Sequence, residues 1–204
     1  MKTIIYSPGD PAGIGPDIFL SLMHEGFFEY IKANVVCMGD KELFHSRSKE
    51  LGYSLEINSF SNINDINEKV GFLEIIKCHD ISSGILNSTN SEYVIENLDF
   101  AIDTCVKKMG FGLVTGPISK ENIIEGGYSF SGHTERIMQK TNSDNVLMLL
   151  ASERLKVALA TTHMPISKVP ESITKELIYN KVKILNKELK EKFNIENPKI
   201  CLLY

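Results

Sequence analysis

The chain has 204 residues, of which 43% are hydrophobic and 24% are charged, which is typical of a folded domain and excludes the disordered, collagen-like and disulfide-scaffold classes. Its 22 basic and 26 acidic side chains give a net charge of −4, and no block of lysine or arginine is dense enough to bind a nucleic-acid backbone. The composition therefore predicts a folded protein without a nucleic-acid partner and indicates no particular function.

The apolar runs and the cysteines indicate whether the protein crosses a membrane and in which compartment it works. The amino-terminal apolar run is too short for the core of a secretory leader, and the longest apolar run, residues 146–151, is far below the roughly 20 residues that cross a bilayer. The cysteines at Cys37, Cys78, Cys105 and Cys201 lack the spacing of a metal site or a disulfide framework. We therefore expect reduced, mostly buried cysteines in a cytoplasmic protein with no membrane partner.

Short β-branched runs recur along the chain and predict strands separated by helices. The predicted strands cover residues 3–6, 35–38, 73–76, 112–115, 146–150 and 156–161. This alternation favours an α/β fold in which a largely parallel sheet is covered by helices on both sides. Residues 58–67 are rich in asparagine and serine, which predicts an exposed connection and not a hinge between domains.

Two long helices are predicted from apolar residues at helical spacing. The first covers residues 91–109, with Thr89 and Glu92 fitting a capping box at its start and Gly110 able to end it in a left-handed conformation. The second covers residues 172–193, where one face is apolar and the other carries lysine and glutamate. This pattern is typical of a surface helix packed on a core.

The first motif, SPGDPAGIGPD, directly follows the first predicted strand and contains Gly9, Asp10, Gly13 and Gly15. Pro16 suits the first turn of a following helix. A strand, a glycine turn and a helix start together favour anion binding, because unpaired N–H groups and the helix dipole point outward. The alternative is a strained strand-to-helix turn without a ligand, and the dinucleotide fingerprint GxGxxG is absent.

The second motif, VTGPISKENIIEGGYSFSGHTERI, contains two predicted helix starts. Lys120 opens one helix, and His133 and Thr134 open the next. Polar groups gathered at helix starts readily bind phosphate or carboxylate. Taken separately, Lys120 also fits an ordinary solvated lysine, and the other two also fit capping residues.

The third motif, ALATTHMPISKVPESIT, places His163 directly after a predicted strand. Parallel-sheet proteins bind ligands at the ends of their strands, and a neutral imidazole there can bind a divalent metal. Metal ions usually need three or more protein ligands, so a structural histidine is the alternative on spacing alone.

Together, GDPAGIGP, TGPISK followed by SGHTE, and TTHMP resemble the motifs of the 4-hydroxythreonine-4-phosphate dehydrogenase family of vitamin B6 biosynthesis, in the expected order along essentially the whole chain. The resemblance implies an α/β/α sandwich similar to isocitrate and isopropylmalate dehydrogenases, with two lobes, an active site in the cleft between them and a homodimeric assembly. The lobe boundary is not evident, so residues 1–204 are treated as one domain of this type. Asp17 departs from the family pattern, which usually has glutamate there.

The resemblance implies oxidation of 4-phosphohydroxy-L-threonine by NAD or NADP, followed by loss of carbon dioxide to give 3-amino-2-oxopropyl phosphate. A divalent metal such as zinc, magnesium or cobalt fits these steps, because it stabilises the charge that develops during decarboxylation. The resemblance further implies that His133 and Thr134 contact the substrate, that His163 binds the metal and that the glycine turn lines the cleft. For Lys120 we infer a phosphate or carboxylate contact from its place in the TGPxxK segment. No residue is assigned as catalytic.

Family members are longer than this chain, and their other metal-binding histidines and much of their cofactor site lie beyond its last residue. The apolar, strand-like run after Pro198 has no loop after it. We therefore expect a truncated chain with weakened or absent activity, whose exposed apolar edges favour self-association. The alternatives are a dehydrogenase of a related phosphorylated four-carbon hydroxy acid, a non-catalytic remnant that binds a phosphorylated metabolite and, more distantly, a phosphate acyltransferase of similar fold.

Overall fold

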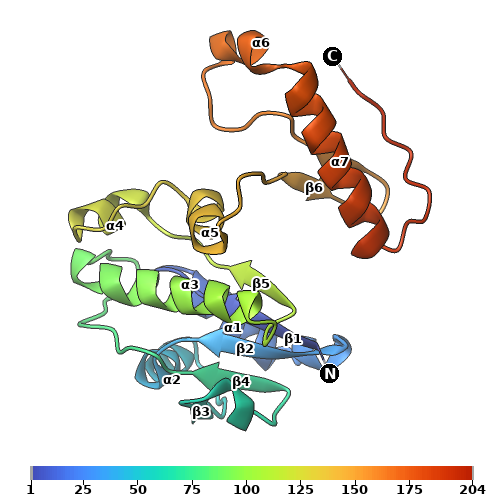
Figure 1. Ribbon diagram of the computed structural model, residues 1–204. Coiled ribbons are helices and arrows are strands. Elements are labelled where there is room, and N and C mark those ends of the chain that lie inside the picture. Colours follow the sequence, from blue (N-terminus) through green and yellow to red (C-terminus); the bar gives the residue numbers. More distant parts are fainter. Residues whose placement is uncertain (1, 204) are drawn as a thin grey trace. The chain divides into compact units, whose positions relative to one another are not determined.

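The computed structural model describes residues 2–203. The chain divides into two compact units, Met1–Asn142 and Ser143–Tyr204. Both are seen in Figure 1, and each is described by itself.

The first unit is built on a parallel sheet. Its strands are β1 (Lys2–Ser7), β2 (Ala33–Met38), β3 (Ser59–Phe60), β4 (Val70–Leu73) and β5 (Gly112–Thr115). They lie in the order β3-β4-β2-β1-β5, with Ile5 of β1 opposite Val36 of β2 and Leu113 of β5. Because the paired strands run parallel, the carboxyl ends of β1, β2 and β5 meet along one edge of the sheet, where open α/β sheets bind ligands.

Helices flank this sheet (Figure 1). They are α1 (Gly15–His24), α2 (Lys41–Glu50), α3 (Ser91–Val106), α4 (Lys120–Glu125) and α5 (His133–Thr141), with 3-10 turns η1 (Phe27–Tyr30), η2 (Ile63–Asp65) and η3 (Ser88–Asn90). Successive residues of β2 enter two different hydrophobic clusters, as the two-residue period of a strand requires. Val35 packs in one cluster with Phe44 of α2. Val36 packs in the other with Ala101 of α3, which confirms the predicted α/β fold.

The second unit has a smaller, antiparallel sheet. Its elements are β6 (Leu149–Ala151), β7 (Lys156–Ala158), η4 (Ile166–Lys168), α6 (Val169–Ser172) and α7 (Lys175–Glu191). Within its described residues only Leu189 is buried, and it is still 7% exposed. Across residues 2–203, no helix combines the length and the apolar character that spanning a membrane would require.

The predicted strands and the structure differ in several places. Of the strands predicted at residues 146–150 and 156–161, only residues 149–150 and 156–158 lie in strands, β6 and β7, and these two strands pair antiparallel. The strand predicted at residues 73–76 overlaps β4 only at Leu73, because Gly71 interrupts the apolar pattern at the centre of the real strand. The stretch 58–67, predicted as a connection, contains the short edge strand β3 and the turn η2. The apolar run predicted as a strand after Pro198 is irregular over residues 199–203.

Both signals predicted at the ends of the first long helix are wrong. The amide of Thr89 donates to the side chain of Asn87 at the start of η3, so Thr89 does not cap α3. After α3 ends at Val106, Lys108 and not Gly110 has the left-handed conformation, with a φ of 60°. Gly110 is instead needed for packing, because a Cβ there would lie 2.6 Å from a side-chain carbon of Ile5.

All four cysteines are free, as predicted. The expectation that they are mostly buried is wrong: Cys37 is buried, Cys78 and Cys105 are partly exposed, and Cys201 is exposed. Burial follows position in the fold here, since Cys37 lies on the central strand β2 while Cys201 lies in the irregular last residues.

Candidate functional site

The turn after β1 packs its backbone directly against the loop after β5. The amide of Asp10 donates to the carbonyl of Pro117 over 3.2 Å. Gly9 has a φ of 79°, and a Cβ there would lie 2.2 Å from the same carbonyl oxygen. At Gly15 a Cβ would lie 1.8 Å from the carbonyl oxygen of Pro8. The protein's own backbone therefore requires glycine at both positions, and the role of the turn in lining a cleft stays a prediction.

The carboxylate of Asp10 joins this turn to α4. Asp10 is only 4% exposed. One carboxylate oxygen accepts from the amide of Ala12 at 3.0 Å, and the other accepts from Nδ2 of Asn122 at 3.3 Å. Burial raises the pKa of Asp10, and these two hydrogen bonds oppose the shift. Asp10 is thus a buried acid held between a turn and a helix.

Lys120 and His133 lie at helix starts, as predicted. The hydroxyl of Ser119 accepts from the amide of Asn122 and so caps α4, of which Lys120 is the first residue. The Nζ atom of Lys120 lies 3.8 Å from the position that a Cβ would take on Gly132, the residue before α5. The lysine of α4 therefore lies beside the start of α5, where His133 and Thr134 are the first two residues.

The imidazole of His133 is half-buried and packs its edge against the ring of Phe130, with 5.8 Å between ring centroids. Burial lowers the pKa of His133, and the charge of Lys120 lowers it further. Within residues 2–203 its buried Nε2 atom has no hydrogen-bond partner. Leaving a buried polar atom unpaired costs about 1–3 kcal/mol, so a ligand that satisfies Nε2 recovers this cost.

These charges and dipoles favour an anion at the start of α5. The ammonium group of Lys120 and the amino end of the helix dipole both attract negative charge. The carboxylate of Glu135 also reaches this helix start, with Oε2 2.7 Å from the Cβ position of Gly132, and it partly balances the lysine. What the arrangement can do chemically is bind an anionic group beside a neutral imidazole.

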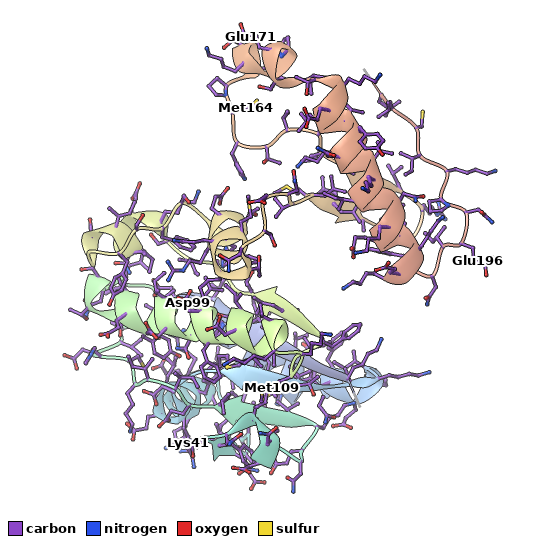
Figure 2. The ribbon with its side chains drawn as sticks, in the orientation of Figure 1. Lys41, Asp99, Met109, Met164, Glu171 and Glu196 are labelled. Atoms are coloured by element: carbon purple, nitrogen blue, oxygen red, sulfur yellow. The ribbon has the colours of Figure 1, made fainter. Side chains whose placement is uncertain are left out.

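Ion pairs attach α5 to α3. The guanidinium group of Arg136 donates to both carboxylate oxygens of Asp99 over 2.7 and 2.6 Å. Lys140, one turn further on, donates to Asp103 over 3.1 Å. Figure 2 labels Asp99 on α3, on the side toward α5. These contacts fix the helix that presents His133.

The sequence gives no signal for the buried Arg47 of α2, which lies in the polar stretch HSRSKE. Arg47 is 4% exposed and donates to Asp17 over 2.8 Å and to the carbonyl of Pro11 over 3.1 Å. Asp17, although shorter than the usual family glutamate, still reaches this guanidinium group. Arg47 thus holds the glycine turn and α1 against α2.

A hollow of about 230 Å³ lies beside Arg47, near the carboxyl ends of β2 and β4. Its lining includes Asp40 and Cys78, whose side chains are 3.2 Å apart. Burial, followed by the contact with Asp40, raises the pKa of the Cys78 thiol. None of the site residues predicted from the sequence lines this hollow.

His163 belongs to the second unit. It lies exposed in the loop after β7, with a φ of 52°. Whether it meets His133 of the first unit stays a prediction. In the described part of the chain, no three histidine, cysteine or acidic side chains come together in a group that could hold a metal ion. These residues alone do not fit a metal centre, and we assign no step to a metal.

The first unit is an open parallel α/β sheet with helices on its flanks, the class of protein in which ligands commonly bind beyond the carboxyl ends of the strands. The family described as "Pyridoxal phosphate biosynthetic protein PdxA" matches residues 31–203, and the chain belongs to this family. The family resemblance inferred from the motifs is confirmed.

Curated relatives agree with this assignment. A 4-hydroxythreonine-4-phosphate dehydrogenase of Vibrio cholerae is 38% identical over 203 residues, which are 98% of this chain and 60% of the relative. One of Serratia proteamaculans is 35% identical over 201 residues, with 97% of this chain and 60% of the relative covered. The chain spans about 60% of the length of these relatives.

Solved structures show the same fold at lower identity. The crystal structure of a 4-hydroxythreonine-4-phosphate dehydrogenase from Burkholderia phymatum superposes with a TM-score of 0.82 at 22% identity, covering 98% of this chain and 61% of that chain. One from Klebsiella pneumoniae gives a TM-score of 0.81 at 21% identity, covering 93% and 60%.

Proposed function

We propose that this chain forms the phosphate-binding part of a 4-hydroxythreonine-4-phosphate dehydrogenase. The observation that carries the proposal is the position of Lys120 near the start of α5, where the half-buried His133 has an Nε2 atom without a partner within residues 2–203. A phosphorylated substrate supplies both the negative charge that Lys120 attracts and a polar atom for Nε2. The names of the curated relatives support this choice of substrate.

In the proposed reaction, the secondary alcohol of 4-phosphohydroxy-L-threonine loses a hydride to NAD or NADP and a proton from its hydroxyl group. The resulting keto acid loses its carboxyl group as carbon dioxide and gains a proton, which yields 3-amino-2-oxopropyl phosphate for pyridoxal phosphate synthesis. Lys120 binds the phosphate, and His133 and Thr134 hydrogen-bond to the substrate. Because the pKa of His133 is lowered, its imidazole is neutral at neutral pH. Covering a neutral ring with the substrate costs less desolvation energy than covering a charged one.

The proposal keeps several features that the motifs implied. A divalent metal, zinc, magnesium or cobalt, would take His163 as one ligand and need further ligands from outside the described residues. We also propose a homodimer that works in the cytoplasm, to which the four free cysteines are suited.

Titration calorimetry of 4-phosphohydroxythreonine into the chain tests this proposal. Lys120→Ala is expected to weaken binding about tenfold or more, since a lost charge-assisted contact costs about 1.5–3 kcal/mol. Lys41→Ala is the matched control, because it removes the same charge from an exposed lysine on α2 (Figure 2). Equal affinity for 4-hydroxythreonine without its phosphate, or equal effects of the two variants, would contradict the proposal.

A second candidate is a non-catalytic protein that binds a phosphorylated metabolite. The lack of a metal-ligand group in the described residues favours it. Incubation with substrate, NAD and zinc or magnesium tests it, because NADH formation would exclude a non-catalytic protein. A substrate analogue without the amino group tests for the related four-carbon hydroxy acid, which would then be turned over as fast.

A further inference from the structure

We propose that Asp10 and Asn122 are positioning residues, which hold the first turn of α4 so that Lys120 lies beside His133. The inference rests on the proposed function for its purpose, and on the contacts of the first unit for its geometry. Neither side chain is offered as a contact to the substrate.

Asn122 is at the centre of these contacts, and it is only 5% exposed. Its Nδ2 donates to Asp10 at 3.3 Å and to the carbonyl of Asn87 at 3.4 Å. The backbone carbonyl of Asn122 accepts from the hydroxyl of Ser91 at 3.0 Å. One residue therefore connects α4 to the glycine turn, to the residue before η3 and to the start of α3.

The position of Lys120 follows from these contacts. It lies two residues before Asn122, in the same first turn of a helix of six residues. So short a helix is not stable by itself, and its direction is set by tertiary contacts. If the side-chain amide of Asn122 is removed, the first turn of α4 loses its hydrogen bond to Asp10 in the glycine turn. The ammonium group of Lys120 is then free to leave the start of α5.

The alternative is that Asn122 stabilises the fold without directing Lys120. Asn97 of α3 provides the comparison, because it is also a buried asparagine, 2% exposed, whose Nδ2 donates to a carbonyl, that of Tyr93, at 2.8 Å. This hydrogen bond lies within α3 and involves neither Lys120 nor His133. Replacing it removes a buried amide without disturbing the proposed link.

The experiment follows the His133 imidazole of the 204-residue chain by NMR, as a function of pH and of added inorganic phosphate. The charged groups at this helix start are Lys120 from α4 and Glu135 from α5 itself. Lys120→Ala is the reference and is expected to raise the pKa of His133 by removing a positive charge. Asn122→Ala is expected to raise it in the same direction and to weaken phosphate binding about fivefold, the effect of one hydrogen bond.

Asn97→Ala is expected to lower stability while leaving both readouts unchanged. Asp10→Ala combined with Asn122→Ala should weaken phosphate binding by less than the two single effects added together, because each single variant already removes the hydrogen bond that the two side chains share. If Asn122→Ala does not fold, Asn122→Gln keeps the amide but displaces it by one methylene.

The inference is overturned if the Asn122 variants leave the pKa of His133 unchanged while Lys120→Ala moves it, or if Asn97→Ala moves it equally. A wild-type chain that does not bind phosphate counts against the proposed function alone. The pKa comparison still decides the positioning role in that case.

Discussion

Replacing Gly9 by alanine tests the packing of the glycine turn most sharply. Alanine at a φ of 79° costs about 1–2 kcal/mol in backbone strain. Its Cβ would lie 2.2 Å from the Pro117 carbonyl oxygen, so the two loops must separate. Separating the loops breaks the hydrogen bond from Asp10 to Pro117, which contributes about 1 kcal/mol. Displacing the packed backbone costs about 1–3 kcal/mol more. The total predicted loss in unfolding free energy is about 3–6 kcal/mol.

Urea unfolding measures this loss against a matched control. Gly52 has a φ of 74° and no atom within 4 Å of its Cβ position, so Gly52→Ala carries the strain of the left-handed conformation alone. With a slope of about 2 kcal/mol per M, the midpoint should fall by about 1.5–3 M for Gly9→Ala and by about 0.5–1 M for Gly52→Ala. Equal midpoints for the two variants would refute the close backbone approach.

Three further predictions follow from other contacts. Asp99→Ala should speed hydrogen exchange across α5 about tenfold, because it releases Arg136 and Lys140 from their ion pairs with Asp99 of α3. Lys187→Ala breaks an exposed ion pair and should leave exchange in α5 unchanged. If exchange is not faster in the Asp99→Ala variant, the ion pairs do not hold α5 on α3. Arg47→Met should lower the unfolding free energy by about 2 kcal/mol through its lost bonds to the glycine turn, and an unchanged urea midpoint would count against that link. Burial raises the pKa of Tyr6 to about 12 in the folded chain. Between pH 10 and 12 the hydroxyl therefore ionises in the unfolded chain but not in the folded one, so the stabilisation that is present below pH 10 is lost as the pH rises. Tyr6→Phe should therefore show a shallower alkaline loss of stability, and an identical pH curve would argue against a buried hydroxyl.

The sequence predicted the fold best where local signals agree with tertiary structure. The strand at residues 112–115 coincides with β5, and Lys120 and His133 begin helices as expected. Prediction failed where packing decides conformation. Gly110 looked like a helix stop, but Ile5 and Cys105 leave no room there for a side chain.

The candidate site was predicted in part. The motifs indicate Lys120 and His133, yet only the folded chain brings them together at the start of α5. The link between Asp10 and Asn122 spans 112 residues, so no local pattern reports it. Arg47 was missed for a related reason, since its neighbours in sequence are those of an exposed helix while its partners belong to the glycine turn.

A crystal structure of this chain with 4-phosphohydroxythreonine tests the central claim most directly. The account predicts phosphate oxygens within hydrogen-bonding distance of Lys120 Nζ and a ligand atom paired with His133 Nε2. A ligand bound elsewhere, with the Nε2 of His133 paired instead to a protein atom, would contradict it.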